Sequence, residues 1–543
     1  MPRPHSSHDS TAHNENDDDD DDETAPLVGA LKSDNARKES RWHRTLAALP
    51  PASFFLLFTE FAERACYFGV AATLVLYMQQ MLSFAASTTS AVSSAFTFAA
   101  YGFVLLGGWA ADRGLGAAPT VAAFGAAYLV GLALLSASAS PAAFAAFPYG
   151  PTWAVAGLGA GLGLIALGTG GIKANVASLV GGVSAPQEVE TAYRYYYLFI
   201  NVGSTVGTLV VPLLQHVGPA VALSSSQASS ACGNASSSEQ EQGDSGYYAS
   251  FTLCTALFAC AFIVFLAGWP FYARTTATGK TSILTRAAAM AMRARENRLK
   301  RGAAFWSVPA GRDHWMWWAC VDAAAAPGDD DAQFVADVTA TLFAVRPFLA
   351  TMPVYWVAYL TMGTVMVFQA ELMYLPWGMA ANQLMAADHV FIIVLVPVID
   401  AVVLPTLRSA TGLALTAVTR ISAGFVLAAL SMFAAAGVQV AVNGAACQGR
   451  VNALAQLPQY FLLAASEVLV GAGSLEYVYL HSAASMKSVA MSALLFTTAV
   501  AAAIQAAYSP ALQQAVYVWV FVGLGCAVAA AGGVLVVAFG GRD

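Results

Sequence analysis

The chain has 543 residues, of which 58% are hydrophobic and 10% are charged. Soluble domains carry about 25% charged residues, so this composition excludes an ordinary soluble enzyme, a disordered scaffold and a nucleic-acid-binding protein, and it indicates one large membrane body. The formal net charge of −7 describes a tail and not a substrate preference, because residues 1–23 hold nine acidic side chains and one arginine.

The first 45 residues are rich in Asp, Ser and His, and they include an unbroken run of Asp over residues 17–22. A segment of this composition cannot bury a core, so we expect residues 1–45 to form a disordered acidic tail in the cytoplasm.

Long apolar runs follow Pro50, and a membrane-spanning helix requires about 20 such residues. The sequence therefore predicts an all-α integral membrane protein with twelve transmembrane helices in contact with the lipid bilayer. The runs lie near residues 52–81, 91–112, 118–138, 152–180, 194–215, 250–272, 347–372, 387–405, 413–438, 457–481, 488–508 and 514–539.

The two longest gaps between the runs differ in charge. Residues 273–346 carry ten Lys and Arg side chains, whereas residues 216–249 carry none and contain the sequon Asn234-Ala-Ser236. Because basic loops stay in the cytoplasm, the first gap is predicted inside, the second outside, and both chain ends inside. The basic run 286–301 fits either a helix on the inner leaflet or a solvated linker.

These gaps predict two halves of six helices each. The N-terminal bundle covers residues 46–272, a basic cytoplasmic linker covers residues 273–346, and the C-terminal bundle covers residues 347–543. The second run of each half ends in an acid, Asp112 before Arg113 in one half and Asp400 in the other. Parallel halves of this kind are typical of the major-facilitator fold, which holds its substrate between the halves near mid-membrane.

The seven cysteines show no paired spacing and no cluster with histidine, so the sequence predicts no metal. Cys232 and Cys447 fall in loops predicted outside, where a disulfide between them stays open as an alternative to free thiols.

Several ionisable residues lie inside the apolar runs, where a charge costs about 2.5–3.5 kcal/mol. Glu60, Glu63 and Arg64 have helical spacing that places them on one face, so we expect them to face a polar interior and to pair. Lys173 and Glu467 are also deep in their runs, and such groups are functional candidates by default. For Asp112 and Asp400, near the inner helix ends, a structural ion pair is the simpler interpretation.

Six motifs in order resemble the proton-dependent oligopeptide transporter family, the peptide, nitrate and histidine carriers of the major facilitator superfamily. The motifs, covering the chain from about residue 45 onward, are Glu60-x-x-Glu63-Arg64, Gly107-Gly-Trp-Ala-Ala-Asp112-Arg113, Gly168-Thr-Gly-Gly-Ile-Lys173-Ala-Asn175, Tyr196-Tyr197-Leu-Phe-Ile200-Asn201-Val-Gly203-Ser204, Pro458 to Glu467, and Leu475-Glu476-Tyr with Ser485-Met-Lys-Ser488.

The resemblance implies roles for the matching residues. Lys173 would attract a substrate carboxylate and Glu467 a substrate amino group, and the two would pair with each other in the empty protein. The residues implied for proton coupling are Glu60, Glu63 and Arg64; those for the substrate pocket are Tyr67, Tyr101, Lys173, Asn201, Trp356, Asp388 and Glu467; those for structure or gating are Asp112, Arg113, Asp400 and Glu476.

The chain departs from the family pattern at several of these positions. Phe68 replaces a second tyrosine, and Leu360 is apolar where peptide carriers tend to have an acid or glutamine. Tyr359 stands where plant nitrate carriers have a substrate histidine. Asp388 stands where the family usually has Asn.

The sequence therefore predicts a proton-coupled symporter of di- and tripeptides that works by alternating access, as a monomer, in the plasma membrane or a vacuolar or lysosomal membrane. The proton is the coupling ion and no cofactor is expected. Two alternatives stay open: a proton-coupled carrier of nitrate, histidine or another small anion or amino acid, and a nutrient sensor that binds without transport. A membrane enzyme is disfavoured, because the deep residues contain no Ser/His/Asp set.

Overall fold

The computed structural model describes most of the chain after residue 49, with interruptions in several loops. The predicted acidic tail, Cys232, Asn234 and Cys447 all lie outside the described residues. The described ranges are residues 50–145, 150–184, 189–216, 246–272, 283–304, 307–309, 314–320, 329–411, 416–445, 450–483 and 486–539.

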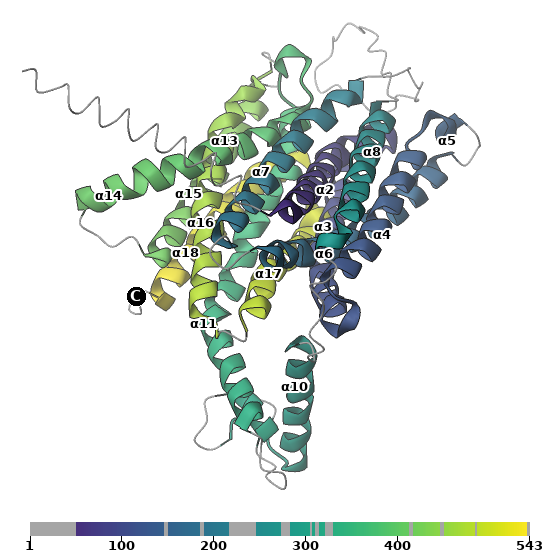
Figure 1. Ribbon diagram of the computed structural model, residues 1–543. Helices are drawn as coiled ribbons and strands as arrows, with labels where there is room; N and C mark the ends of the chain where they lie inside the picture. The colour runs from purple at the N-terminus through teal and green to yellow at the C-terminus, as the bar shows by residue number, and fades with distance from the viewer. Residues whose placement is uncertain are drawn as a thin grey trace, which may run out of the picture. The chain divides into compact units, whose positions relative to one another are not determined.

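Helices dominate every described range, as the apolar periodicity predicts (Figure 1). The principal helices are α2 (Pro51–Leu76), α3 (Ala86–Ala110), α4 (Ala117–Ser138), α6 (Gly150–Val183), α7 (Val189–Leu213), α8 (Gly246–Ala267), α10 (Ile283–Lys300), α11 (Asp329–Leu360), α12 (Val365–Glu371), α13 (Met385–Val398), α15 (Ala417–Ala445), α16 (Leu457–His481), α17 (Lys487–Tyr508) and α18 (Tyr517–Phe539).

Eleven segments of the described chain are long and apolar enough to cross a membrane. They correspond to the second to the twelfth predicted spans. The first predicted span, α2, is 26 residues long but carries Glu60, Glu63 and Arg64. Its polar groups are buried inside the protein, so a helix of this composition is compatible with a membrane only because its neighbours cover its charges.

The helices of each half pack mainly on one another. In the first half α2 packs on α7 and α8, and α6 packs on α3 and α4. In the second half α15 packs on α16 and α18, and α11 packs on α17. Across the halves, α3 packs on α17 and α7 packs on α13. The division into bundles at residues 46–272 and 347–543 stays a prediction.

The seventh predicted span is not one continuous helix. The helix α11 begins at Asp329, well before residue 347, and ends at Leu360; a short turn, η5 (Thr361–Gly363), then leads into α12. Thr364 has φ −135° and ψ −88°, which breaks the helical hydrogen-bond ladder. Within a membrane such irregular backbone is tolerated only where protein or a cavity surrounds it.

Two π-helical turns occupy matching places in the halves. They are η2 (Ala111–Leu115), which continues α3, and η8 (Ile399–Val403), which continues α13. Each turn contains the acid that the internal repeat singles out, Asp112 in one and Asp400 in the other. A third π turn, η1 (Tyr77–Met81), continues α2 and contains no acid, so the support for the repeat comes from the acid and the π turn together.

A small folded unit lies between the sixth and the seventh spans. Its helix α10 packs on a short turn, η4 (Trp315–Cys320), and on the first turns of α11 through a core that contains Met290, Trp317 and Phe334. Arg286 and Arg293 both pair with Asp331, at 2.9 and 3.0 Å. Neither alternative for residues 286–301 describes this arrangement completely, because the helix is packed against protein.

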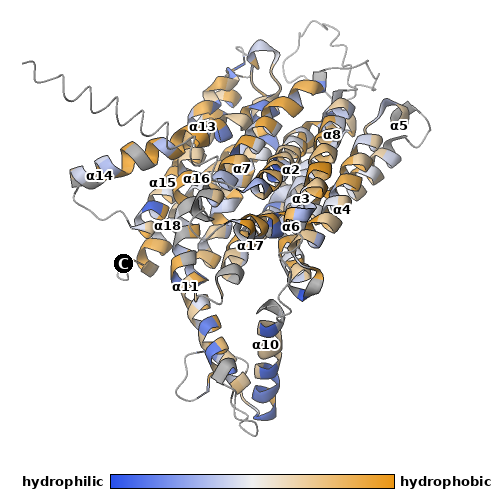
Figure 2. Ribbon diagram, viewed as in Figure 1, coloured by the Kyte–Doolittle hydropathy of each residue, from blue (hydrophilic) through white to orange (hydrophobic). Residues whose placement is uncertain are grey.

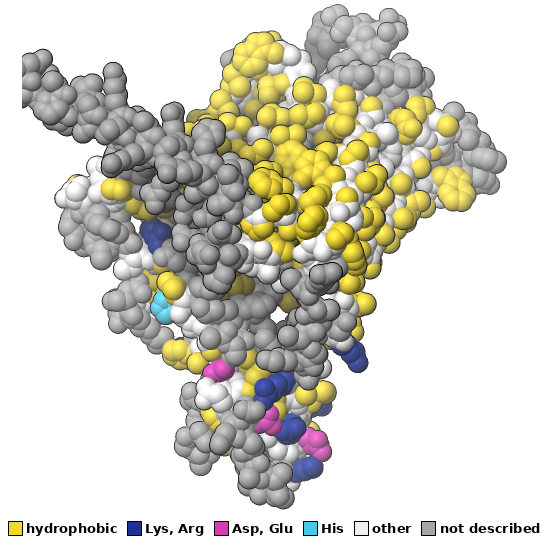
Figure 3. All heavy atoms as spheres, in the orientation of Figure 1, with side chains coloured by type: hydrophobic (Ala, Val, Ile, Leu, Met, Phe, Trp, Pro, Cys, Tyr) yellow, Lys and Arg dark blue, Asp and Glu magenta, His cyan; other side chains and the backbone are white. Residues whose placement is uncertain are grey.

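The surface of the described chain reflects this division. The spanning helices are predominantly apolar, whereas α10 is strongly polar (Figure 2). On the face in Figure 3, hydrophobic side chains cover the spanning helices, and the Lys, Arg, Asp and Glu side chains gather mainly near α10 and the start of α11.

Four glutamines that are fully buried join α12, α15 and α16 into a hydrogen-bonded set, which we call the amide cluster. Gln369 is its centre: its amide nitrogen lies 3.0 Å from Oε1 of Gln439, and its Oε1 accepts from Gln456 at 2.9 Å and Gln459 at 3.2 Å. A buried amide is costly unless it is hydrogen-bonded, and here all the bonds above pair one amide with another, although Oε1 of Gln456 and Oε1 of Gln459 are left without a partner.

Candidate functional site

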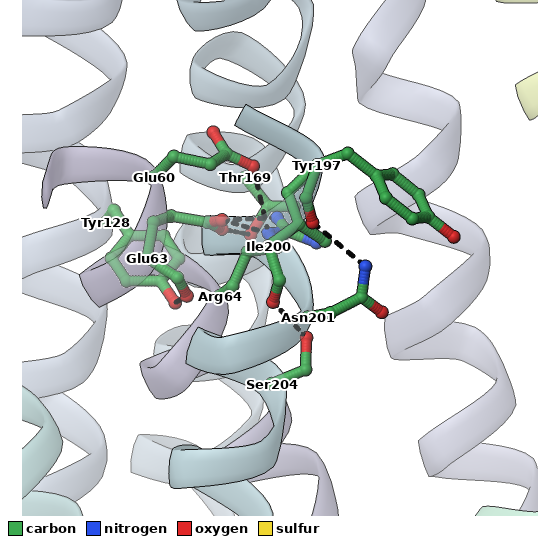
Figure 4. A network of polar contacts seen from close by, with 9 residues as sticks. All are labelled: Glu60, Glu63, Arg64, Tyr128, Thr169, Tyr197, Ile200, Asn201 and Ser204. Atoms are coloured by element: carbon green, nitrogen blue, oxygen red, sulfur yellow. Dashed lines mark hydrogen bonds and ion pairs between the residues drawn. The ribbon is translucent and has the colours of Figure 1, made fainter. Parts of the chain in front are cut away.

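Three buried ionisable residues in the middle of α2, namely Glu60, Glu63 and Arg64, form a group that we call the acid-arginine cluster (Figure 4). Arg64 Nε donates to Oε2 of Glu63 at 2.5 Å, and Arg64 Nε lies 3.5 Å from Oε1 of Glu60. The hydroxyl of Thr169 on α6 donates to the other oxygen of Glu63 at 3.1 Å. All three ionisable residues are at most 2% exposed, so the predicted pairing on one helix face is present and inaccessible to lipid.

Close helix packing holds this cluster in place. A Cβ at Gly203 of α7 would lie 2.4 Å from the carbonyl oxygen of Phe61 and 3.2 Å from Cβ of Arg64, so only glycine lets α7 approach α2 at this level. Tyr128 of α4 adds a hydroxyl that donates to the backbone oxygen of Glu63 at 3.3 Å. Helices α4, α6 and α7 therefore all restrict the acid-arginine cluster.

A cavity of about 160 Å³ lies next to this cluster, between residues of both halves. It has room for roughly ten water molecules. Four of the predicted pocket residues line it, namely Tyr67, Tyr101, Trp356 and Glu467. The broken backbone after α11 also reaches the cavity through Met362, Gly363 and Thr364.

Lys173 does not line the cavity directly. Its ammonium nitrogen lies 3.9 Å from the centroid of the Tyr101 ring, a cation–π contact, and the ring itself lines the cavity. No ion pair joins Lys173 to Glu467 in the described part of the chain, so the expected pair of the empty protein is not formed in this conformation. Lys173 instead acts electrostatically on Glu60 of the acid-arginine cluster.

Asn201 also stands back from the cavity. Its amide nitrogen donates to the backbone oxygen of Tyr197 one turn earlier on α7, at 2.9 Å (Figure 4). Asn201 therefore does not line the cavity in this conformation, and its predicted role in the pocket stays a prediction.

The wall opposite the acid-arginine cluster is acidic. Glu467 of α16 lines the cavity, and Asp388 of α13 lies behind it with no exposure. The hydroxyl of Tyr359 donates to Oδ2 of Asp388 at 3.3 Å and also lines the cavity. Oε2 of Glu467, Oδ1 of Asp388 and Nε1 of Trp356 are all buried without a hydrogen-bond partner. Groups of this kind are available to a ligand or a proton.

The four residues predicted for structure or gating are only partly described. The Arg113 guanidinium lies 5.0 Å from the Trp109 ring centroid and is exposed. The backbones of Asp112, Asp400 and Glu476 lie in η2, η8 and α16, and their side chains are outside the described part of the structure.

Several cavity residues were missed by the sequence analysis. Tyr359 was considered only as the absence of a histidine, yet it connects the cavity to Asp388. Gln505 of α17 lines the cavity and donates to the hydroxyl of Thr364 at 2.7 Å. The available signal was a lone amide inside an apolar run, which is costly in a membrane and therefore informative. Ser94, Thr97 and Thr498 are cavity-lining hydroxyls that gave no such signal.

Known proteins similar to this chain are membrane transporters. The chain is 26% identical over 539 residues to the peptide transporter PTR_C of Candidozyma auris, covering 91% of this chain and 84% of the relative. It is 25% identical over 516 residues to the peptide transporter PTR2 of Saccharomyces cerevisiae, covering 88% and 77%. The fold is similar to the crystal structure of an autoinhibited POT family peptide transporter, with TM-score 0.70, 23% identity, and coverage of 91% of this chain and 97% of that chain.

The family comparison covers most of the membrane body. Residues 118–520 match the POT family, which is the family that the six motifs resemble. This range includes Lys173, Glu467 and the cavity wall formed by α11, α13 and α16. The chain is therefore a multi-pass integral membrane transporter, not an enzyme, and it belongs to the POT family of proton-dependent oligopeptide transporters.

Proposed function

We propose that this chain carries small peptides, of two or three residues, across a membrane together with protons by alternating access. The observation that carries the proposal is the arrangement of charge around one cavity. A buried acid-arginine cluster lies on α2, Lys173 lies on the cavity-lining ring of Tyr101, and Glu467 lines the same cavity from the other half. The printed names of similar proteins as peptide transporters support the same substrate class.

A zwitterionic peptide complements this arrangement. Its carboxylate is attracted to Lys173, whose ammonium group now rests on Tyr101, and its ammonium group is attracted to Glu467. Each contact draws a group of one half toward the cavity, so the bound peptide favours closure of the halves around it. The aromatic walls, Tyr67 and Trp356, suit variable side chains because they provide area without a specific polar demand.

Proton coupling is assigned to Glu63. Protonating this carboxyl removes its attraction for Arg64, which then has Glu60 alone at 3.5 Å as its anionic partner. A buried cation that loses its best partner is strongly destabilised, so the proton shifts the equilibrium between conformations. An imported charge also draws about 2.3 kcal/mol per 100 mV of membrane potential.

An anion such as nitrate is a less suitable substrate. The wall of the cavity that contains Asp388 and Glu467 would repel it, and Tyr359 provides a single hydroxyl where a histidine could provide a cation. Free histidine carries an ammonium group and a carboxylate, so it remains a candidate within the same charge pattern. A non-transporting sensor would use the same cavity, and only flux distinguishes it.

We further propose that Asp112, Arg113, Asp400 and Glu476 control the inner ends of the helices, since Asp112 and Asp400 recur in matching π turns. The proposed unit is a monomer with both ends in the cytoplasm, in the plasma membrane or a vacuolar or lysosomal membrane.

The proposal is tested with purified protein in liposomes that have an inward proton gradient. Dipeptides, histidine and nitrate are offered in turn, and we expect accumulation of dipeptides that collapses when the gradient is dissipated. Lys173→Ala should lower this uptake at least tenfold, because the carboxylate of the peptide loses its cation. The control is Lys300→Ala, whose lysine is exposed and pairs with Glu296 on α10. Accumulation of nitrate but not of dipeptides, or full uptake by Lys173→Ala, would reject the assignment.

A further inference from the structure

Asp388 and Glu467 place two carboxyl groups close to the same cavity, and the transport cycle above assigns no role to Asp388. Asp388 is completely buried, and Glu467 is partly buried and lines the cavity. Tyr359 donates its hydroxyl to Asp388 and, like Glu467, lines the cavity. Each carboxyl keeps one buried oxygen that has no hydrogen-bond partner.

No cation compensates Asp388 within the described residues. The groups that act on it are Glu467 and Tyr359. The other titratable groups that face it are hydroxyls: Tyr355 from α11, Tyr460 from α16 and Tyr197 from α7.

The neighbouring histidine on α13 does not supply the missing charge. Its Nδ1 lies 3.3 Å from the backbone oxygen of Met385, and the ring of His389 packs 5.0 Å from that of Phe68. Its contacts are thus to a backbone carbonyl on its own helix and to an apolar ring.

The contrast with the acid-arginine cluster is informative. There, Glu60 and Glu63 share Arg64, and Glu63 also receives a hydroxyl donor from Thr169. Two carboxylates without a cation, each with a buried oxygen that has no hydrogen-bond partner, cannot both stay ionised, because burial and mutual repulsion both favour the neutral acid. One proton on the pair removes the repulsion and supplies a donor.

We propose that Asp388 is a proton-binding carboxyl group, which holds its proton while Glu467 binds a substrate ammonium group. Asp388 is the better place for the proton, because it is the more deeply buried of the two and a ligand in the cavity reaches Glu467 first. With Asp388 neutral, one ammonium group balances the wall completely. The proton reaches Asp388 past Tyr359, since this residue lines the cavity and its hydroxyl donates to Asp388.

Only the ammonium part of this inference rests on the proposed peptide substrate. The proton on Asp388 follows from burial and from the absence of a compensating cation, and it can be measured without any substrate.

The direct test is infrared difference spectroscopy of the full protein in liposomes at neutral pH. The wild type minus Asp388→Asn spectrum should contain the C=O stretch of a protonated carboxyl group, since the amide of the variant has no such band. Tyr359→Phe should shift that band to higher frequency, because the carboxyl loses a hydrogen bond. Glu296→Gln, an exposed α10 position, should not change the band. Identical spectra for the wild type and Asp388→Asn overturn the proposal, and if that variant does not fold, an unshifted band in Tyr359→Phe overturns it.

A second measurement links the proton to the ligand. The affinity for a dipeptide is measured with equal pH on both sides, over a rising pH series. Loss of the proton from Asp388 at high pH leaves a second carboxylate, which strengthens the attraction for the ammonium group. Over the pH range in which Asp388 ionises, the affinity of the wild type should therefore rise by up to a factor of ten per pH unit relative to that of Asp388→Asn. Equal slopes would show that Asp388 does not exchange a proton in the bound state and would count against the proposal. Absence of any peptide binding by the wild type rejects the proposed function instead, and the infrared band still decides the fate of Asp388.

Discussion

At the scale of single residues, the two acids of α2 are not equivalent. Glu63 receives Arg64 at 2.5 Å and the Thr169 hydroxyl, whereas Glu60 has Arg64 at 3.5 Å. Both carboxylate oxygens of Glu60 are buried without a hydrogen-bond partner. Protonation of Glu63 therefore removes the closest ion pair of the cluster. Glu60 is then the anion that still pairs with Arg64.

This asymmetry predicts the behaviour of Glu63→Gln. The neutral amide can still accept from Thr169 but no longer takes up a proton, so accumulation driven by a proton gradient should fall to the level of empty liposomes. Counterflow exchange, which needs no net proton movement, should continue at a reduced rate. Both rates are measured with labelled dipeptide in the same liposomes.

A control variant with the same change of charge shows whether the loss of accumulation is specific to Glu63 or follows from removing any carboxylate. Glu296→Gln removes an exposed carboxylate on α10 and should leave both rates unchanged. Gradient-driven accumulation by Glu63→Gln would show that the coupling proton binds elsewhere.

The sequence predicts the charged members of the site better than the neutral ones. Glu60, Glu63 and Arg64 could be found because ionisable groups in apolar runs are costly, and their helical spacing places them together. Tyr359 and Gln505 escaped notice because a tyrosine or a single amide is less unusual in a membrane helix. The position of Lys173 on Tyr101, and not on Glu467, depends on the conformation, which no residue pattern encodes.

At the scale of helices, α3 and α6 cross at a point where neither has room for a side chain. A Cβ at Gly107 would lie 2.6 Å from the backbone oxygen of Gly170. The carbonyl of Gly107 also accepts from the Asn175 amide at 3.1 Å. Because Lys173 lies between Gly170 and Asn175 on α6, this crossing determines where the lysine meets Tyr101. Small residues at such contacts are the usual way for membrane helices to pack closely.

Two adjacent glycines allow a controlled test of this crossing. Gly107→Ala must push α3 and α6 apart and should destabilise the protein by about 1–3 kcal/mol, the usual cost of overpacking. Gly108→Ala adds the same methyl group where nothing lies within 4 Å, so it should be neutral. Thermal unfolding in detergent compares the two variants, and equal midpoints would mean that the crossing adapts without cost.

Helix boundaries were the least predictable feature at this scale. The apolar run near 347–372 gave no sign of the break after Leu360, because Thr361, Met362 and Gly363 are all compatible with a membrane helix. The extension of α11 back to Asp329 was also hidden, since its first turns are charged and are stabilised by packing against α10. Recurrence of the acids Asp112 and Asp400, by contrast, correctly pointed to matching local structure.

At the scale of the whole molecule, hydrogen bonds between the halves gather at the end of the bundle that is predicted to lie outside. Ser509 donates to Ser90 at 2.8 Å, and Asn382 donates to the backbone oxygen of Ala72 at 3.0 Å. The Gln79 amide donates to both oxygens of Glu371, at 3.3 and 3.2 Å. In an alternating-access cycle these contacts must separate when the outer side opens.

The contact between Ser90 and Ser509 can be converted into a reversible lock. Both residues are completely buried, and cysteines at the two positions are close enough to be bridged. Oxidation of the Ser90→Cys/Ser509→Cys protein should stop transport, and a reducing agent should restore it, because the outer side cannot open while the bond is intact. Uptake assays with and without oxidant measure the effect.

The single-cysteine proteins provide the control, since the described chain already contains free cysteines such as Cys66 and Cys254. Both single variants should continue to transport after oxidation. Transport by the oxidised double variant would mean that this end of the molecule does not need to open.

The amide cluster has a further consequence for how the molecule senses acidity. Its four glutamines carry no group that titrates at physiological pH, so the acidification that protonates and neutralises the carboxyl groups around the cavity leaves the cluster unaltered. The packing of α12 on α15 and α16 through these amides therefore does not depend on pH. A change of pH in the surrounding compartment therefore alters the charge around the cavity but not the hydrogen bonds that hold these helices together.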